Sequence, residues 1–435
     1  MLLLLLALVS KASCALTNVP FYPTISTNES ETPNTKATMN TFRLSPQDQT
    51  DLVNFLRDLV QIPSPSTQES TVAERIVAEM KRLGFRNVCT DCIGNVIGWI
   101  GPGHGSLLMF NGHMDTVRVS DPETWSHDPF GAEVEDGVLY GVGTCDMKGG
   151  LAAMIYGAKL LRDAGTALKG DVVVACVVQE EPCEGLGSSV LVEEDGIRPD
   201  WVVLGEPTGL DVSRGQRGRL EMRLVTHGRS AHAACPDLGE NAIYTSARLV
   251  FGLELLAGQL GSDDFLGPGT LAVTGIASSA SGRNVVPDRC ELIIDRRLTL
   301  GENETKALAE VRRVIAREGV RAEVDVTEYH AASYTGYACH ARESYPAWVL
   351  AEDHPLVVST VRAVREQSKR RPRVSRWDFS TSGVYTAGMA GIPTVGFGPG
   401  DPHQAHTTDE CVRLADVYAA AEVYARLAVE LLGVE

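Results

Sequence analysis

The sequence has little positive charge. Its 435 residues include 39 lysines and arginines against 56 aspartates and glutamates, which gives a formal net charge of −17 at pH 7. We find no basic run of the kind that neutralises phosphates, so we expect no nucleic-acid partner. The acidic balance favours solubility and, taken alone, does not indicate a substrate.

A long apolar run at the N-terminus is also missing. The run over residues 2–9 is too short to span a bilayer, and we expect no membrane partner. The small residues at 12–15 resemble the cleavage region of a signal peptide, although no positive residue precedes the run. Residues 1–40 are therefore a secretory leader with a disordered linker, or a mis-assigned start before a cytoplasmic protein that begins at Met39.

The ten cysteines do not form a dense disulfide framework. They are scattered along the chain and mostly lie in apolar strings, whereas disulfide scaffolds are short and rich in cysteine. Cys89 and Cys92 form one CxxC pair, with no second pair to complete a four-sulfur metal site. We interpret them as buried free thiols rather than as a structural zinc site.

Helical and strand patterns alternate after residue 40. Helical spacing is found over 46–59, 72–83 and 150–161, and apolar or β-branched runs predict strands at 107–110, 171–178 and 201–204. This alternation implies an α/β layer with a mostly parallel central sheet.

The pattern changes near residue 213. Residues 219–225 alternate polar and apolar, as a strand with one buried face does, and a long helix is expected over 241–260. We interpret residues 213–332 as an α+β unit inserted in the α/β layer. The α/β domain is then split into residues 41–212 and 333–435, and residues 1–40 lie outside it.

Acidic residues and histidines stand where the predicted strands end or helices begin. They are His113, Asp115, Asp146, Glu180, Glu181, Glu206 and His406. Sites in open α/β sheets form outside the carboxyl ends of the strands, so these side chains are expected to converge. Each one alone is more often a cap, a turn residue or a surface residue. Such explanations would have to coincide at every strand end, and we therefore favour a shared site.

The residue types suit a pair of zinc ions. Histidine and carboxylate are zinc ligands, although Co²⁺ or Mn²⁺ could occupy the same set. Asp146, Glu181, Glu206 and a hydroxide would balance the four charges of two Zn²⁺, which a partly desolvated site needs. Asp115 lies two residues beyond His113 on the same side of an extended chain. We expect its carboxylate to accept the second ring N–H of His113.

The strings around these residues resemble the co-catalytic zinc family of aminoacylase, acetylornithine deacetylase, succinyl-diaminopimelate desuccinylase and glutamate carboxypeptidase. They are Asn111-Gly112-His113-Met114-Asp115-Thr116-Val117, Gly143-Thr144-Cys145-Asp146-Met147-Lys148-Gly149-Gly150, Gln179-Glu180-Glu181 and Gly205-Glu206-Pro207-Thr208. The resemblance runs from about Met39 to the end, in the family's order. The segments 214–219, 377–381 and 396–400 resemble a branch labelled a selenium-metabolism-linked hydrolase, which carries no firm substrate.

The resemblance implies a zinc-peptidase-like catalytic domain and a role for each of these residues. Asp146 would bridge two Zn²⁺, with His113 and Glu206 completing one ion and Glu181 and His406 the other. Glu180 would be the general base that takes a proton from the bridging water and hands it to the leaving nitrogen.

The resemblance also implies that the inserted unit is a lid that forms a homodimer. His232 would reach the partner's site and stabilise the oxyanion, and Asn284 and Arg297 would hold a substrate carboxylate. Each has an ordinary alternative: a surface histidine, a turn residue, and an arginine paired with Asp295 or Glu291.

We therefore predict a metal-dependent amidohydrolase acting on a small N-acyl amino acid or dipeptide-like substrate that carries a carboxylate. A dipeptidase or carboxypeptidase is an alternative that the sequence does not separate from a deacylase. A non-catalytic binding homologue is a third reading, which the loss of Glu180 or of a ligand would have supported.

Overall fold

The computed structural model describes residues 41–280 and 282–435. The expected leader and the alternative start at Met39 lie outside these residues. Residues from Thr41 to Glu435 group into one unit by their contacts. Across the part of the chain that the structure describes, no helix combines the length and the apolar character needed to cross a membrane.

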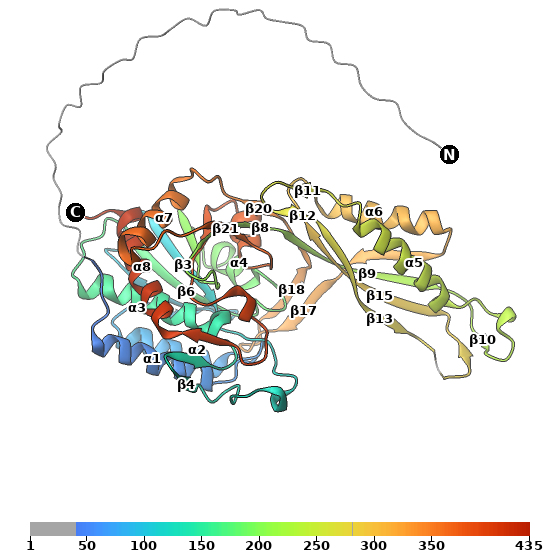
Figure 1. The fold of residues 1–435 in the computed structure, drawn as a ribbon, viewed down its shortest axis with the longest axis horizontal. Coiled ribbons are helices and arrows are strands. Elements are labelled where there is room, and N and C mark those ends of the chain that lie inside the picture. The colour runs from blue at the N-terminus through green and yellow to red at the C-terminus, as the bar shows by residue number, and fades with distance from the viewer. Residues whose placement is uncertain (1–40, 281) are drawn as a thin grey trace, which may run out of the picture. The chain divides into compact units, whose positions relative to one another are not determined.

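The catalytic domain is built on a mixed sheet (Figure 1). Within the described residues its nine strands are β1 (Arg86–Thr90), β2 (Val96–Ile100), β6 (Asp171–Val177), β3 (Leu107–His113), β7 (Trp201–Leu204), β22 (Thr394–Gly396), β8 (Val212–Gln216), β20 (Trp348–Val349) and β21 (Val374–Trp377). The central run β6-β3-β7-β22 is parallel, whereas β1, β2 and β20 pair antiparallel with their neighbours. The α/β class is confirmed, with a parallel centre and one further parallel pair, β21 with β8, toward the other edge.

Helices bury both faces of this sheet. They are α1 (Pro46–Gln61), α2 (Ser70–Arg82), α3 (Gly149–Asp163), α4 (Leu186–Glu193), α7 (Pro355–Ser368) and α8 (Leu414–Leu432). Successive strand residues point to opposite faces, so Leu108 and Phe110 join the core with α3 and α8, while Met109 joins the core with α4. Burial on both faces explains why the central strands read as continuous apolar runs. It also fixes the position of their carboxyl ends.

The inserted domain, or lid, has its own sheet and core. Its strands are β9 (Gly218–His227), β13 (Thr270–Ser278), β15 (Arg289–Leu298), β16 (Ala322–Val326) and β19 (Ser344–Tyr345), and its helices are α5 (Ala242–Ala257) and α6 (Glu304–Glu318). Alternate residues of β15 are buried against the helices. A two-stranded ladder of β10 (Ala231–His232) and β14 (Val285–Val286) lies at the end of the lid away from the catalytic domain (Figure 1). The expected inserted α+β domain is confirmed.

Two crossings connect the domains. Residue 213, where the lid was expected to begin, lies in β8 of the large sheet, and Gly218 begins the lid strand β9. A Cβ at Gly218 would lie 2.4 Å from the carbonyl oxygen of Tyr345, so only glycine fits this crossing. Residue 332, the expected end of the lid, closes the first strand of a hairpin formed by β17 (Glu328–Ala332) and β18 (Ala338–Arg342). The chain passes back from the lid to the catalytic domain between β19, which pairs with β9 of the lid, and β20, which pairs with β8 of the large sheet.

Smaller elements complete the described chain. They are the three-stranded β23 (Cys411–Arg413), β5 (Val138–Tyr140) and β4 (Val134–Glu135), and the paired β11 (Ser262–Asp263) and β12 (Gly267–Pro268). The thiols of Cys89 and Cys92 are free, as expected, but they are exposed. The prediction that they are buried is wrong, because Cys89 lies on β1, the edge strand of the large sheet, and Cys92 lies in the exposed turn that follows it.

Candidate metal centre

The carboxyl ends of the four parallel strands bring the candidate ligands together. His113 ends β3, the pair Glu180 and Glu181 follows β6, Glu206 follows β7, and the loop after β22 leads to His406. Asp146 lies in a kinked turn, Thr144–Lys148, directly before α3, and its own backbone is not helical (φ −118°, ψ 92°). The structure thus joins five sequence-predicted segments at one edge of the sheet, as the strand-end argument predicts.

Asp146 faces two histidines with different oxygens. Its Oδ1 lies 2.9 Å from Nε2 of His113, and its Oδ2 lies 3.4 Å from Nε2 of His406. Each histidine also faces a second carboxylate, with Glu206 Oε1 3.8 Å from His113 Nε2 and Glu181 Oε2 2.9 Å from His406 Nε2. Asp146 therefore joins two groups of side chains, one around His113 and one around His406.

The donor set fits divalent metal ions. Ligand atoms of His113, Asp146 and Glu181 lie within 4.8 Å of one another, and so do those of His113, Glu180 and Glu206. Within the described residues, Oε1 of Glu180 and Oε1 of Glu181 are buried without a hydrogen-bond partner. An unpaired buried carboxylate oxygen is costly, and a bound cation would satisfy that of Glu181.

The protonation equilibria of the cluster also suit a bound cation. Burial raises the pKa of Glu180 and of Glu206 well above the ordinary 4.5, and neighbouring carboxylates raise both further. Burial acts in the same direction on Asp146, but the hydrogen bond with His113 keeps the pKa of Asp146 below its ordinary value. Carboxylates packed this closely stay ionised together only beside compensating positive charge.

Asp115 holds the loop of Glu180 rather than the ring of His113. The predicted bond to the carboxylate is wrong, because His113 Nδ1 lies 2.9 Å from the backbone oxygen of Asp115 and 3.7 Å from its Oδ1. That carbonyl accepts the Nδ1 proton and leaves Nε2 of His113 free to bind a metal ion. The Asp115 carboxylate instead accepts hydrogen bonds from the backbone N–H groups of Glu180 (3.1 Å) and Glu181 (3.2 Å) and from the hydroxyl of Ser66 (2.7 Å).

Glu410 is a supporting residue that the sequence reasoning missed. Its buried carboxylate accepts hydrogen bonds from the backbone N–H groups of Gly143 (3.0 Å), Cys145 (2.8 Å) and Asp146 (2.9 Å). These bonds fix the turn that presents Asp146. An acidic residue four positions after His406 carries no pattern that would reveal this contact, since it depends on two loops more than 260 residues apart.

The lid candidates lie in two separate places. His232 pairs with Val285 across the β10–β14 ladder, and the backbone N–H of Ala233 donates to the carbonyl of Asn284 (2.8 Å), so His232 and Asn284 are neighbours. Arg297 lies near the other end of β15, and at about 3.3 Å per residue this strand is roughly 30 Å long. The structure therefore does not bring Asn284 and Arg297 of one chain together. Arg297 makes the ion pair with Asp295 that was its alternative reading (2.8 Å).

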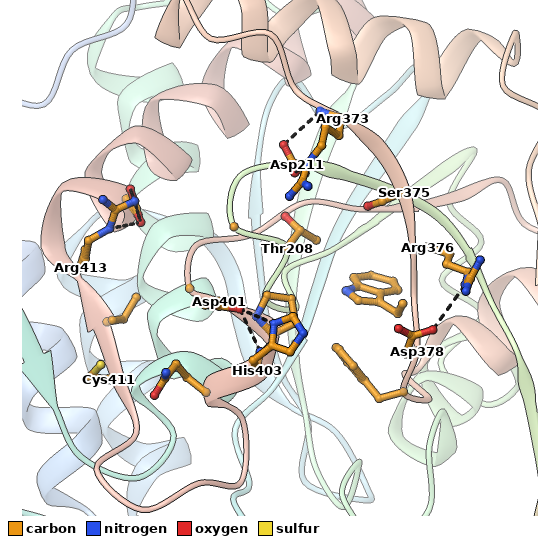
Figure 2. A pocket seen from close by; sticks show the side chains of 18 of the residues that line it. Thr208, Asp211, Arg373, Ser375, Arg376, Asp378, Asp401, His403, Cys411 and Arg413 are labelled. Carbon is orange, nitrogen blue, oxygen red and sulfur yellow. Dashed lines mark hydrogen bonds and ion pairs between the residues drawn. The ribbon is translucent and has the colours of Figure 1, made fainter. Parts of the chain in front are cut away.

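A cavity of about 840 Å³ lies beside the loops of the centre (Figure 2). It is lined by Thr208 and Gly209, just after Glu206, and by the loop from Gly400 to Gln404, which leads to His406. Residues of and beyond β21, from Arg373 to Phe379, form another wall. None of the candidate ligands lines it, and so it is a neighbouring compartment rather than the metal centre itself.

Comparison with known proteins assigns the family. The profile of Peptidase family M20/M25/M40 matches residues 109–430. The chain belongs to this family. The M20 family consists of metallopeptidases and amidohydrolases, so the chain is a metal-dependent hydrolase of carbon–nitrogen bonds, and the predicted family and enzyme class are confirmed.

Individual M20 relatives cover nearly the whole described chain. The uncharacterized protein YgeY of Escherichia coli (strain K12) is 40% identical over 388 residues, covering 89% of this chain and 96% of the relative. Succinyl-diaminopimelate desuccinylase 2 of Ruegeria sp. (strain TM1040) is 28% identical over 396 residues, covering 88% and 96%. The structure of the Bacillus subtilis YXEP protein, a dinuclear metal-binding peptidase from the M20 family, has a TM-score of 0.66 at 17% identity, covering 89% and 99%. At 17% identity, the similarity to the YXEP protein shows a shared fold alone.

Proposed function

We propose that this chain is a dinuclear zinc amidohydrolase that removes the acyl group from a small N-acyl amino acid or dipeptide-like substrate. The observation that carries the proposal is Asp146, whose two carboxylate oxygens face two different histidines. One ion would be held by His113, Asp146 and Glu206, and the other by Asp146, Glu181 and His406. When bound, the ions supply Lewis-acid polarisation of the amide carbonyl and a lowered pKa for water.

Glu180 is the group that we assign to proton transfer. It lies beside the ligands, but its Oε1 has no hydrogen-bond partner among the described residues and is free to accept a proton. Its backbone N–H is held by Asp115. Glu180 accepts a proton from the attacking water and passes it to the leaving nitrogen, so that the C–N bond breaks to give a carboxylate and an amine.

His232 is suited to donate a hydrogen bond to the developing oxyanion. Its Nδ1 accepts the backbone N–H of Ala234 at 3.0 Å, so the neutral ring carries its proton on the exposed Nε2. β10, which holds His232, lies at the end of the lid away from its own catalytic domain (Figure 1). We therefore assign His232 and its neighbour Asn284 to the active site of a second copy of the chain.

The lid has a surface that supports a homodimer. Tyr244, Phe251 and Leu255 occupy one face of α5 and are 72%, 67% and 63% exposed. Ile276 is also exposed on β13, which is an edge strand of the lid sheet. An exposed apolar helix face beside an open strand edge is the kind of surface that a symmetric partner covers.

Arg297 is the group that we assign to the substrate carboxylate. Its guanidinium is already paired with Asp295, so the substrate would have to share or displace that partner. Because Arg297 lies near the end of β15 and Asn284 lies before β14, ahead of the start of β15, the two substrate contacts would come from different subunits. A dipeptidase remains the second candidate, since it differs from a deacylase only in the group on the acyl side.

The experiment that tests the reaction combines metal content with a substrate panel. The protein, produced from Met39, is measured for zinc per chain and assayed on N-acetyl, N-succinyl and dipeptide substrates, before and after a chelator. About two zinc ions per chain and chelator-sensitive amide cleavage are expected. No bound metal, together with no turnover after Zn²⁺, Co²⁺ or Mn²⁺ is restored, would support the binding-homologue reading instead.

Mixed dimers test the role of His232. Glu180→Gln and His232→Ala homodimers are both expected to be inactive. A mixed dimer regains one complete site, since the His232→Ala subunit keeps Glu180 and receives His232 from its partner. Random exchange should therefore restore about one quarter of the wild-type sites. If His232 serves its own subunit, mixing restores nothing.

A further inference from the structure

The hairpin of β17 and β18 carries a second group of metal-ligating side chains. Glu328 and His330 lie two residues apart on one face of β17, and His340 is the cross-strand partner of His330 in β18. All three side chains are exposed, and none belongs to the metal centre described above. We propose that Glu328, His330 and His340 form a binding site, here called the hairpin site, for a divalent transition-metal ion such as Zn²⁺.

Two of the three separations between ligand atoms in the hairpin site match those around a bound zinc ion. One oxygen, Oε2 of Glu328, lies 3.4 Å from Nε2 of His330 and 3.3 Å from Nε2 of His340. Zinc–ligand bonds are about 2.0–2.2 Å long, so two ligand atoms on one tetrahedral ion lie roughly 3.3 Å apart. The two oxygen–nitrogen separations thus already have the required length.

The third separation, between the ring nitrogens of His330 and His340, can be adjusted by rotation of the two exposed rings. The ligand atoms of all three residues lie within 4.8 Å of one another. The rings of His330 and His340 are stacked with their centres 4.3 Å apart and their planes 13° apart, and the Nε2 atom of each faces Oε2 of Glu328. Imidazole suits zinc, copper and nickel, and a water molecule would complete the fourth position.

The charges next to the hairpin site also suit a divalent cation. Arg342 is the cross-strand partner of Glu328, but its guanidinium pairs more closely with Glu304 (2.8 Å) and Asp325 (2.9 Å) than with Glu328 (3.8 Å). Three carboxylates against Arg342 and Arg312, whose charge acts on Asp325, leave one net negative charge in this group. The Oε2 atom of Glu328 faces the two histidines and not Arg342.

The opposite face of the hairpin contacts the catalytic loop. Tyr329, which lies between Glu328 and His330, donates its hydroxyl hydrogen bond to Oε1 of Gln179 (2.8 Å), the residue before Glu180. An ion in the hairpin site would cross-link β17 and β18, on the outer face of the element whose inner face supports Gln179. Figure 1 places this hairpin on the side of the catalytic domain from which the lid extends. We expect the ion to stabilise the hairpin and to take no part in hydrolysis.

Equilibrium dialysis of the full chain against buffered zinc tests the proposal. The wild type is compared with His330→Ala and His340→Ala over a range of free zinc concentrations. His403→Ala is the matched control, because His403 is an exposed histidine beside a carboxylate, Asp401 (2.8 Å), outside the hairpin. Both hairpin variants should bind one ion fewer than the wild type, and the control should bind the same number. Equal zinc content in all four proteins would overturn the proposal.

Retention of the untagged protein on immobilised Ni²⁺ gives a second measurement. The wild type and His403→Ala should elute together, and His340→Ala should elute earlier. Circular dichroism checks that each variant is folded, since both histidines are exposed and their loss should leave the core intact. Equal retention of His340→Ala and the wild type would also overturn the proposal.

Discussion

The substitution Glu180→Gln separates proton transfer from metal binding. Glutamine keeps the volume of the side chain and the backbone N–H bond from residue 180 to Asp115 (3.1 Å). It replaces the carboxylate, whose Oε1 is buried without a hydrogen-bond partner among the described residues, by an uncharged amide that does not accept a proton. If Glu180 is the general base, kcat falls while the zinc content and KM stay close to the wild-type values.

The expected loss can be bounded from the surroundings of Glu180. General acid–base catalysis contributes about 10²–10⁴-fold to rate, which corresponds to about 3–5 kcal/mol of transition-state stabilisation. Glu181, the next carboxylate, is assigned as a ligand and faces His406 at 2.9 Å. Glu184, the carboxylate after it, is held by Arg219 at 3.0 Å, so neither group replaces Glu180. We therefore expect the upper part of this range, a loss of about 10³–10⁴-fold in kcat.

Glu181→Gln is the matched control, because it places the same change one residue later in the same loop. Glu181 lies 2.9 Å from His406 and is assigned as a ligand, so its glutamine variant should lose zinc. The assay measures kcat, KM and zinc per chain for both variants on one amide substrate. Zinc loss by Glu180→Gln to the level of Glu181→Gln would refute the reasoning, and so would near-wild-type turnover.

Three further predictions follow from the structure. Asp115→Asn removes charge-assisted hydrogen bonds to the Glu180–Glu181 loop, and zinc affinity or turnover should fall by about 10–100-fold, measured by competition with a chelator. Phe251→Glu should give a monomer by light scattering with little hydrolysis and an intact metal content, because the exposed face of α5 would no longer pair. Burial raises the pKa of Glu79, but hydrogen bonds from Arg82, Tyr156 and Arg75 bring it below the ordinary 4.5. Its contribution to stability is then full above pH 4.5 and lost as the pH falls through the lower folded value, so Glu79→Gln should differ most from the wild type near neutral pH in denaturant titrations.

The catalytic fold was predictable where local pattern and burial agree. The strand at 201–204 was predicted with its observed bounds, and the helix at 46–59 was predicted to within two residues of its end. The edge strand β1 and the hairpin β17–β18 had no distinct pattern, whereas the apolar run of β2 at 96–100, of which four residues are buried, was not assigned to a strand. β1 is an exposed edge strand, and β17 alternates exposed with half-buried residues because only one face contacts the protein.

The candidate ligands were predictable because parallel topology itself brings strand ends together. A residue directly after a central strand has few other places to lie. The supporting contacts had no such constraint. Asp115 was assigned by its spacing to the ring of His113, but the backbone carbonyl of Asp115 is closer to that ring than its carboxylate is. The carboxylate turns instead toward the next loop, where two backbone N–H groups are available.

The residues proposed to select the substrate are arranged differently from those proposed to bind metal. The ligands come from one sheet edge, so short motifs in one chain are enough to predict them. His232 and Asn284 lie at one end of β15 and Arg297 at the other, a separation of roughly 30 Å at about 3.3 Å per residue. No conformation of β15 as a strand lets these residues of one chain surround one small substrate. In our proposal the substrate pocket is therefore divided between two chains. For this reason the type of bond that is hydrolysed can be predicted from the sequence, whereas the identity of the substrate cannot.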